Sequence, residues 1–163
     1  MDKYLAFTLK ENTVVDRLET PVLLNSRIRD CSITIDPDKK WRGIWDTGAK
    51  TSSIHKRIVD ELGLYALDEW TMQTANGIAV VTTYFLDITL PNNVMISNIL
   101  VSASDPGDEI DVLIGMDIIS QGDFSISNVN GCTTFSFRIP SVKEIDYVKE
   151  ANDTNRCLSS EDK

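Results

Sequence analysis

The sequence has few cysteines and almost no histidine, which limits the chemistry that it can support. Three cysteines (Cys31, Cys132 and Cys157) and a single histidine (His55) occur among 163 residues. An odd number of widely spaced cysteines predicts neither a disulfide framework nor a zinc site. We therefore expect no metal ion in this protein, and a reducing, cytoplasmic setting for it.

Long apolar runs and clustered positive charge are also absent from the sequence. No run approaches the length of a membrane span, and the first residues do not lead into the apolar core of a signal peptide. The chain has 16 Lys and Arg against 25 Asp and Glu, a net charge of −9. Without a basic stripe, phosphates cannot be neutralised. We expect neither a membrane nor a nucleic acid as partner.

What is present is ordinary for a soluble globular protein. Hydrophobic residues make up 42% of the chain and charged residues 25%, and the length suits one domain with a core of its own. Acidic residues gather towards the C-terminal end. We predict an N-terminal strand or extension at 1–21, a folded domain at 22–139, and an acidic tail at 140–163 that is partly helical.

Short β-prone runs separated by turn residues dominate the chain. They predict strands at 4–9, 22–28, 31–35, 41–45, 71–75, 78–90, 94–102, 111–115, 124–128 and 132–139. Asn76-Gly77 and Asn130-Gly131 each lie between two such runs, which is a strong hairpin signal. A helix capped by Ser53 is expected at 54–62, a helical turn or two at 116–120, and a further helix at 143–150. The pattern indicates a mainly β fold, a barrel or a sandwich, with one or two short helices.

One polar tetrapeptide interrupts this apolar pattern at a chemically suggestive place. The run from Gly43 to Trp45 leads directly into Asp46-Thr47-Gly48-Ala49. A carboxylate held at a strand end, between a tryptophan and a glycine, suits a partly dry site. The simpler interpretation is an Asx-turn, in which the Asp46 side chain accepts a hydrogen bond from its own backbone. The Asp-Thr-Gly tripeptide alone favours the Asx-turn.

The order of the motifs along the chain resembles that of the retropepsins, the retroviral-type aspartic proteases with cellular and bacterial relatives. A strand, Asp46-Thr47-Gly48-Ala49, a helix, an Asn-Gly hairpin and Leu113-Ile114-Gly115 follow one another as in that family. The stretch from 113 to 128 is similar to the second family signature in length and polarity. The resemblance covers roughly residues 22–139 and implies a closed β-barrel, the half-domain of an acid protease.

The resemblance also implies an activity and a partner. Aspartic proteases hydrolyse peptide bonds with water activated between two carboxylates that share a proton. This chain has one Asp-Thr-Gly, so the resemblance implies a homodimer with Asp46 from each copy. The Thr47 hydroxyl would then connect the Asp46 loops of the two copies, and Gly48 would accept hydrogen bonds from the substrate backbone. Ala49 stands where pepsin-like members often have Ser or Thr. No cofactor is implied.

By the same resemblance, the hairpin at 73–81 would be the flap that closes over an extended peptide. Its tip, Ala75, Asn76, Gly77 and Ile78, would contact the substrate, and Gly115 would lie next to the site. Two positions differ from the viral pattern, in which an acidic residue follows the Ala and an Arg follows the second Gly. Lys50 occupies the first position and Met116-Asp117 follows Gly115, so these charges form either a reversed pair or solvated surface groups.

Two other interpretations remain open on the sequence. The chain could be an inactive retropepsin-fold domain that binds peptides or acts as a scaffold. It could also be an all-β module outside this family, with Asp46 in an Asx-turn. A mass measurement and a statine-type inhibitor separate these possibilities. The substrate and the role of the chain ends in dimerisation are not specified by the sequence.

Overall fold

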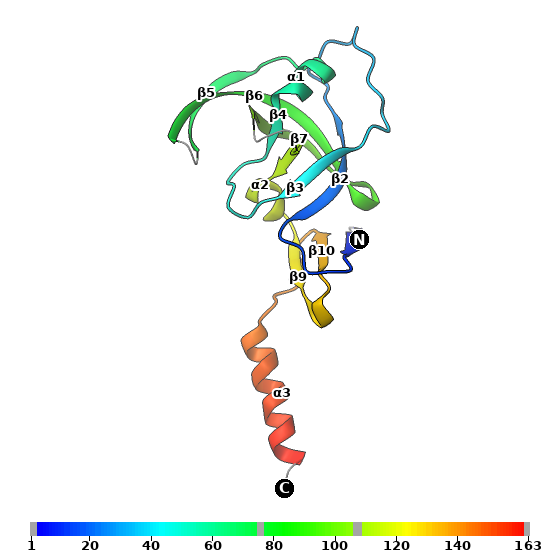
Figure 1. Ribbon diagram of the computed structural model, residues 1–163, viewed down its shortest axis with the longest axis vertical. Helices are drawn as coiled ribbons and strands as arrows, with labels where there is room; N and C mark the ends of the chain where they lie inside the picture. Colours follow the sequence, from blue (N-terminus) through cyan, green and yellow to red (C-terminus); the bar gives the residue numbers. More distant parts are fainter. Residues whose placement is uncertain (1–2, 75–76, 106–108, 162–163) are drawn as a thin grey trace.

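The computed structural model describes residues 3–74, 77–105 and 109–161. Two β-sheets and three α-helices make up this part of the chain, and the last helix projects from the body (Figure 1). The prediction of a mainly β fold is confirmed. A helix is present in each of the three regions where the sequence predicts one, and the C-terminal helix is longer than predicted.

The larger sheet has seven strands and closes on itself. Its order is β2-β3-β8-β4-β7-β6-β5, and an additional pairing of β2 with β6 completes a barrel with β5 attached to β6. The strands are β2 (Leu18–Asn25), β3 (Trp41–Trp45), β4 (Ser53–His55), β5 (Asp68–Thr74), β6 (Gly77–Leu90), β7 (Val94–Ser104) and β8 (Val112–Ile114). The short 3₁₀ segment η1 (Pro91–Asn93) joins β6 to β7.

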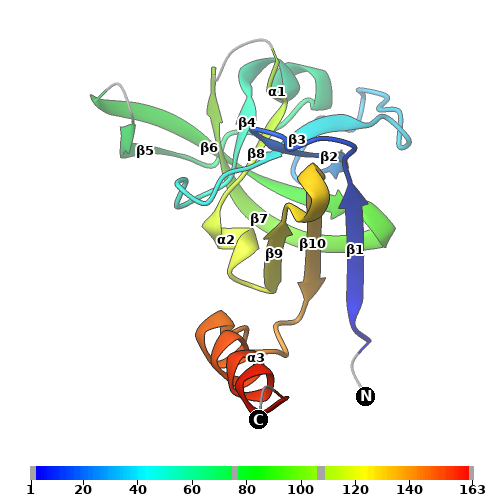
Figure 2. The ribbon, with the colours of Figure 1, turned by 60° about the horizontal axis from the view of Figure 1, so that its bottom comes forward.

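The smaller sheet pairs a strand that precedes the barrel strands in the sequence with two strands that follow them. Its order is β1-β10-β9, all antiparallel, from β1 (Leu5–Lys10), β9 (Asp123–Ser127) and β10 (Thr134–Ile139). Figure 2 shows the three strands side by side below the barrel. The 3₁₀ segment η2 (Val129–Gly131) connects β9 to β10, with positive φ at Asn130 and Gly131. The hairpin predicted around Asn130-Gly131 is therefore confirmed.

The helices differ from the sequence prediction at their boundaries. They are α1 (Lys56–Leu62), α2 (Met116–Ile119) and α3 (Tyr147–Glu161). The prediction of a helix from residue 54 with Ser53 as cap is wrong, because Ser53–His55 forms β4 between β7 and β8. His55 caps α1 instead, its Nδ1 accepting a hydrogen bond from the Arg57 backbone N–H. Gly63 ends the helix in the left-handed conformation.

The side chain of His55, the residue before α1, is mostly shielded from solvent. Its side chain is only 12% exposed, and Nε2 lies 3.5 Å from the Asp105 carboxylate. Nδ1 thus caps the helix, and Nε2 faces the Asp105 carboxylate without a hydrogen bond. This is a structural role at the barrel end.

The strand predicted at 31–35 is absent, and the cause is local. The Asp30 carboxylate accepts a hydrogen bond from the Ser32 backbone N–H at 2.8 Å, which bends the chain into an Asx-turn. The hydrogen bond from Ser32 also holds the pKa of Asp30 below its usual range. The segment is instead stabilised by the Arg29 guanidinium, which donates to the backbone oxygens of Asp30 and Ile33.

The core has a barrel part and an aromatic part. Aliphatic side chains fill the barrel, among them Ile54, Ile88, Val101 and Ile114, all fully buried. Five aromatic rings form a cluster between the barrel and the smaller sheet: Phe7, Trp45, Phe124, Phe135 and Phe137. Trp45 is the barrel's member of this cluster, so the two sheets pack on the residue that directly precedes Asp46.

No helix among the described residues is long and apolar enough to cross a membrane.

Candidate active site

The barrel places Asp46 where two parallel strands end. β3 pairs with β8 in parallel register, Ile44 opposite Leu113 and Trp45 opposite Ile114. The Asp46 backbone N–H extends this ladder by donating to the Ile114 carbonyl at 2.9 Å. The first motif therefore lies directly against the second, although they are far apart in the sequence.

The loop from Asp46 to Ala49 is held by short hydrogen bonds. The Gly48 backbone N–H donates to the Asp46 carboxylate at 2.8 Å, and Met116 N–H donates to the Ala49 carbonyl at 2.8 Å. Asp46 and Ala49 are half-buried, whereas Thr47 and Gly48 are exposed. The Asx-turn of the simpler interpretation is thus present. Because it fixes the carboxylate at the protein surface, it is compatible with a catalytic role as well.

A buried serine connects this loop to α2. The Ser52 hydroxyl donates to the Asp117 carboxylate at 2.7 Å and accepts from the Gly115 N–H at 3.0 Å, and the Ser52 N–H donates to Asp117 at 2.8 Å. The sequence suggested that Asp117 is either a solvated surface charge or the partner of Lys50. Both suggestions are wrong for Asp117, because its carboxylate accepts hydrogen bonds from Ser52. Sequence reasoning missed Ser52 and its contact with Asp117, because nothing local links positions 65 residues apart.

Gly115 is required by close packing of the backbone. A Cβ at this position would lie 2.7 Å from the Thr51 carbonyl carbon and 3.0 Å from the Ala49 carbonyl oxygen. Neither backbone atom can move without displacing the loop that follows Asp46. Gly115 thus packs directly against the loop that follows Asp46.

Removing the Ser52 hydroxyl should weaken this part of the fold. Ser52→Ala leaves the Gly115 N–H without its acceptor in a buried position, and we expect a loss of about 1–3 kcal/mol in the free energy of unfolding. Urea denaturation measures it. The neighbouring Ser53 is a matched control, because its hydroxyl makes only a long contact, 3.4 Å, with the Ser104 hydroxyl. Equal losses for Ser52→Ala and Ser53→Ala would contradict the role given to Ser52.

The hairpin of β5 and β6 is the candidate flap. Its strands pair from Asp68 opposite Thr83 to Thr74 opposite Gly77, and Gly77 has a φ of +112°. Ala75 and Asn76, two of the four predicted tip residues, lie outside the described residues. Ile78, the last of the four, is 75% exposed. In both ribbon views the hairpin projects on the side of the barrel where the loop after β3 lies (Figures 1 and 2).

Two hollows in the surface differ in their relation to this loop. One, of about 230 Å³, is lined by Trp45 and Thr47 together with Phe124 and Ile126 of β9. The loop that contains Asp46 and the smaller sheet therefore share a surface.

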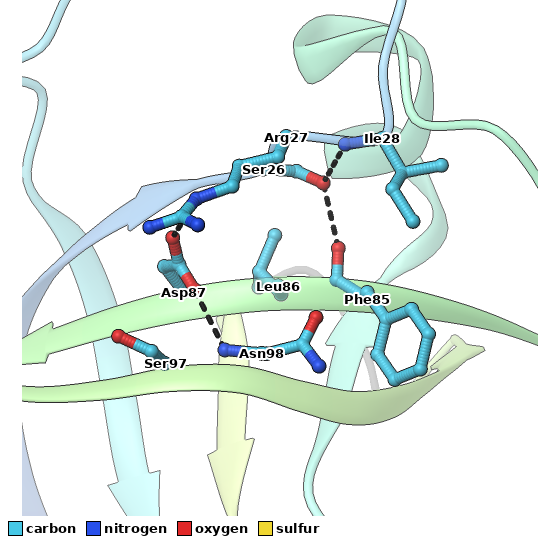
Figure 3. A pocket seen from close by; sticks show the side chains of 8 residues that line it. All are labelled: Ser26, Arg27, Ile28, Phe85, Leu86, Asp87, Ser97 and Asn98. Carbon is cyan, nitrogen blue, oxygen red and sulfur yellow. Dashed lines mark hydrogen bonds and ion pairs between the residues drawn. The ribbon is translucent and has the colours of Figure 1, made fainter.

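The other hollow, of about 320 Å³, contains no residue of the loop (Figure 3). Its polar groups are engaged with one another: Asp87 accepts from the Asn98 N–H at 2.6 Å and lies 4.0 Å from Arg27, and the Ser26 hydroxyl donates to the Phe85 carbonyl. This hollow lies where the pairing of β6 with β7 shifts register, between Leu86 and Ile88. We assign it no function.

Groups of three or more His, Cys, Asp or Glu side chains that could hold a metal ion do not occur within the described ranges. The carboxylates near the loop instead form hydrogen bonds within the chain.

Comparison with known proteins places these features in one family. The family described as "gag-polyprotein putative aspartyl protease" matches residues 31–121, which is more than half of the chain. Among solved structures, a retropepsin-like aspartic protease from Rickettsia conorii is similar, with a TM-score of 0.54 and 17% identity over 84% of this chain and 96% of that one.

Two further solved structures match with lower TM-scores. The retroviral protease-like domain of Ddi1 from Leishmania major has a TM-score of 0.47 and 17% identity over 82% of this chain and 99% of that domain. The EIAV protease has a TM-score of 0.44 and 20% identity over 64% of this chain and 86% of that one. No curated protein matches the sequence.

The family match removes the alternative of an unrelated all-β module, and the Rickettsia structure supports the retropepsin-like fold. Strand β3, the Asp46 loop, β8 and Gly115 all lie within the matched residues. The chain belongs to the retropepsin-like aspartic protease family.

Proposed function

We propose that this protein is an aspartic endopeptidase that works as a homodimer, with Asp46 of each copy at one shared site. The observation that carries the proposal is the loop itself. A half-buried carboxylate is fixed by the Gly48 N–H at a strand end, in a chain that has one Asp-Thr-Gly sequence. Because the reaction needs two carboxylates, one chain alone cannot supply the site.

In the proposed reaction one Asp46 carboxylate accepts a proton from a water molecule, whose oxygen then bonds to the carbonyl carbon of the scissile peptide. The other, protonated Asp46 donates its proton to the carbonyl oxygen, which gives a tetrahedral intermediate. As this intermediate collapses and the C–N bond breaks, the first Asp46 gives its proton to the leaving amine, and one hydroxyl of the intermediate returns its proton to the second Asp46 as the carbonyl re-forms. The two carboxylates end the cycle sharing one proton, as they began it.

The surroundings of the loop suit these roles. Thr47 is exposed, so its hydroxyl is available to the loop of the second copy. Gly48 is exposed as well, and without a side chain it lets a substrate backbone approach closely. The Ser52–Asp117 contacts hold the segment behind the loop, which keeps the carboxylates in a fixed geometry.

The β5–β6 hairpin is the proposed flap. Ile78 and Val80 lie on the same side of β6, two residues apart, and are 75% and 68% exposed. An extended peptide with apolar side chains is the substrate that such a surface would bind, and closure over it would exclude water.

The test is cleavage of a mixed peptide library at several pH values, with and without a statine-type inhibitor. We expect cleavage that the inhibitor blocks, because its hydroxyl replaces the tetrahedral carbon's oxygen between the carboxylates. Cleavage products also identify the residues preferred on each side of the scissile bond. A dimer that binds peptides without cleaving them at any pH would contradict the proposal and favour a binding or scaffold domain.

A further inference from the structure

The C-terminal helix α3 stands apart from the rest of the protein. In both ribbon views it projects from the end of the smaller sheet, and every residue from Tyr147 to Leu158 is exposed (Figures 1 and 2). Isolated helices of up to about 15 residues are only marginally stable in water, and most helices in proteins are stabilised by packing of one face. The helix α3 has 15 residues. It therefore gains stability if one of its faces is covered.

The charged residues of α3 gather on one face of the helix. Between Tyr147 and Leu158 they lie within about 120° of the helix circumference, at 3.6 residues per turn. They are Lys149, Glu150, Asp153 and Arg156. Asp153 forms ion pairs along this face with Lys149 at 3.3 Å and with Arg156 at 3.1 Å. The opposite face of the same segment is uncharged and open to solvent.

The uncharged face has the residue spacing of a helix that pairs with another helix. Val148, Ala151, Asn155 and Leu158 follow one another at intervals of three, four and three residues, which makes them alternating a and d positions of a heptad pattern. Val148 is 71% exposed and Leu158 is 58% exposed. Asn155 occupies an a position. A single asparagine there fixes the register and the number of helices in a coiled coil.

The absence of charge from this face favours a second copy of α3 as the partner. In a parallel pair of identical helices, each interface residue meets its own copy, so a charged face would repel itself. The whole chain has a net charge of −9, which opposes self-association through most of its surface. The uncharged face of α3 is free of this penalty.

The segment that leads into α3 is held on the body of the protein. The Asp123 carboxylate of β9 accepts hydrogen bonds from the Ser141 hydroxyl at 2.5 Å and from the Val142 N–H at 3.1 Å. The helix thus leaves the body from the sheet that shares a surface with the Asp46 loop. A dimer that joins two such loops therefore also brings two copies of α3 towards each other.

We propose that α3 forms a parallel two-stranded coiled coil with α3 of a second copy, through Val148, Ala151, Asn155 and Leu158. This rests on the proposed function, because the homodimer with two Asp46 carboxylates is what brings the helices together. Linking two binding surfaces raises their effective concentration, so even a short helix pair adds to the stability of the dimer. The helix pair lies outside the barrels and takes no part in the chemistry.

A crosslinking experiment tests which face of α3 is paired. Ala151→Cys places a thiol at a d position, and Asp153→Cys places one on the charged face of the same helix. Both are made in a background in which the native cysteines are replaced by serine, namely Cys31, Cys132 and Cys157. Each variant of the full chain is oxidised under dilute conditions and analysed by non-reducing electrophoresis.

We expect Ala151→Cys to move from the monomer band to the dimer band and to return on reduction, because residues at a d position of a parallel pair lie next to their own copies. Asp153→Cys should stay in the monomer band. No crosslink through Ala151→Cys would overturn the proposal, as would equal crosslinking of the two variants.

A charge introduced on either face gives a second, independent measurement. Ala151→Lys brings two like charges together in the proposed pair, and we expect it to raise the dissociation constant of the dimer by about tenfold or more. Cys157→Lys adds the same charge on the other face, four residues after Asp153, and should leave the dissociation constant unchanged. Sedimentation equilibrium measures both. Equal dissociation constants for the two variants would contradict the helix pair.

Peptide cleavage by the same preparations separates this inference from the proposed function. Cleavage without a crosslink through Ala151→Cys would refute the helix pair and leave the peptidase intact. A crosslink through Ala151→Cys without any cleavage would establish the helix pair and refute the peptidase. At protein concentrations where Ala151→Lys is dimeric, we expect it to cleave peptides with the kcat of the unaltered protein.

Discussion

Replacing Asp46 with asparagine is expected to abolish peptide cleavage and to leave the fold unchanged. The amide cannot accept the proton of the attacking water, and in a homodimer the substitution removes both carboxylates at once. Loss of general acid–base catalysis alone lowers kcat/KM by about 10²–10⁴-fold. The backbone N–H of residue 46 still donates to the Ile114 carbonyl, so the loop keeps its anchor. The measurement is kcat/KM together with the thermal unfolding midpoint.

A surface carboxylate provides the control for this variant. Asp153 on α3 is half exposed and pairs with Lys149 and Arg156, so Asp153→Asn removes the same charge far from the chemistry. It should leave kcat/KM unchanged. If Asp46→Asn retained the cleavage rate of Asp153→Asn, the catalytic role of Asp46 would be wrong.

Replacing Trp45 with alanine is expected to produce the largest loss of stability among single substitutions near the site. The indole is 6% exposed and contacts four phenylalanine rings, and its Nε1 donates to the Thr20 hydroxyl at 3.0 Å. Truncating a buried tryptophan costs about 3–5 kcal/mol. The effect reaches the active-site loop, because Trp45 joins the barrel to the smaller sheet. Urea denaturation measures the change.

Trp70 is the matched control, since it is the same residue type on an exposed strand. It is 52% exposed, and Trp70→Ala should change the free energy of unfolding by about 0.5 kcal/mol or less. Trp45→Phe should lower the free energy of unfolding by an intermediate amount, about 1–3 kcal/mol. It keeps a ring in the cluster but leaves the Thr20 hydroxyl without its donor. Similar losses for Trp45→Ala and Trp70→Ala would show that the aromatic cluster does not join the sheets.

The features that the sequence predicted well are those set by neighbouring residues. Asn130-Gly131 forms its hairpin because both residues adopt positive φ. The order of Asp46, a helix, a hairpin and Gly115 was sufficient to identify the family, since each motif is a short local signal.

The features that were predicted poorly from the sequence depend on contacts with residues far away along the chain. Residues 53–55 are part of a strand because β7 and β8 pair on either side of them, and this outweighs the helical spacing of the apolar residues that follow. The Ser52–Asp117 contact joins two motifs across 65 residues. Helix α3 begins at Tyr147 and runs through Glu161, well beyond the predicted 143–150. The homodimer and the individual site roles stay predictions.

The central claim is that two Asp46 carboxylates form one site, and a covalent tandem tests it most directly. Two copies are joined in one polypeptide by a flexible linker, and Asp46→Asn is introduced into one half only. Assays are run at dilutions where the separate chains have lost activity, so that halves of different molecules do not pair. The account predicts full cleavage by the unaltered tandem and none by the half-substituted one. A half-substituted tandem with about half of the activity would mean that each chain cleaves on its own, and the shared site would be refuted.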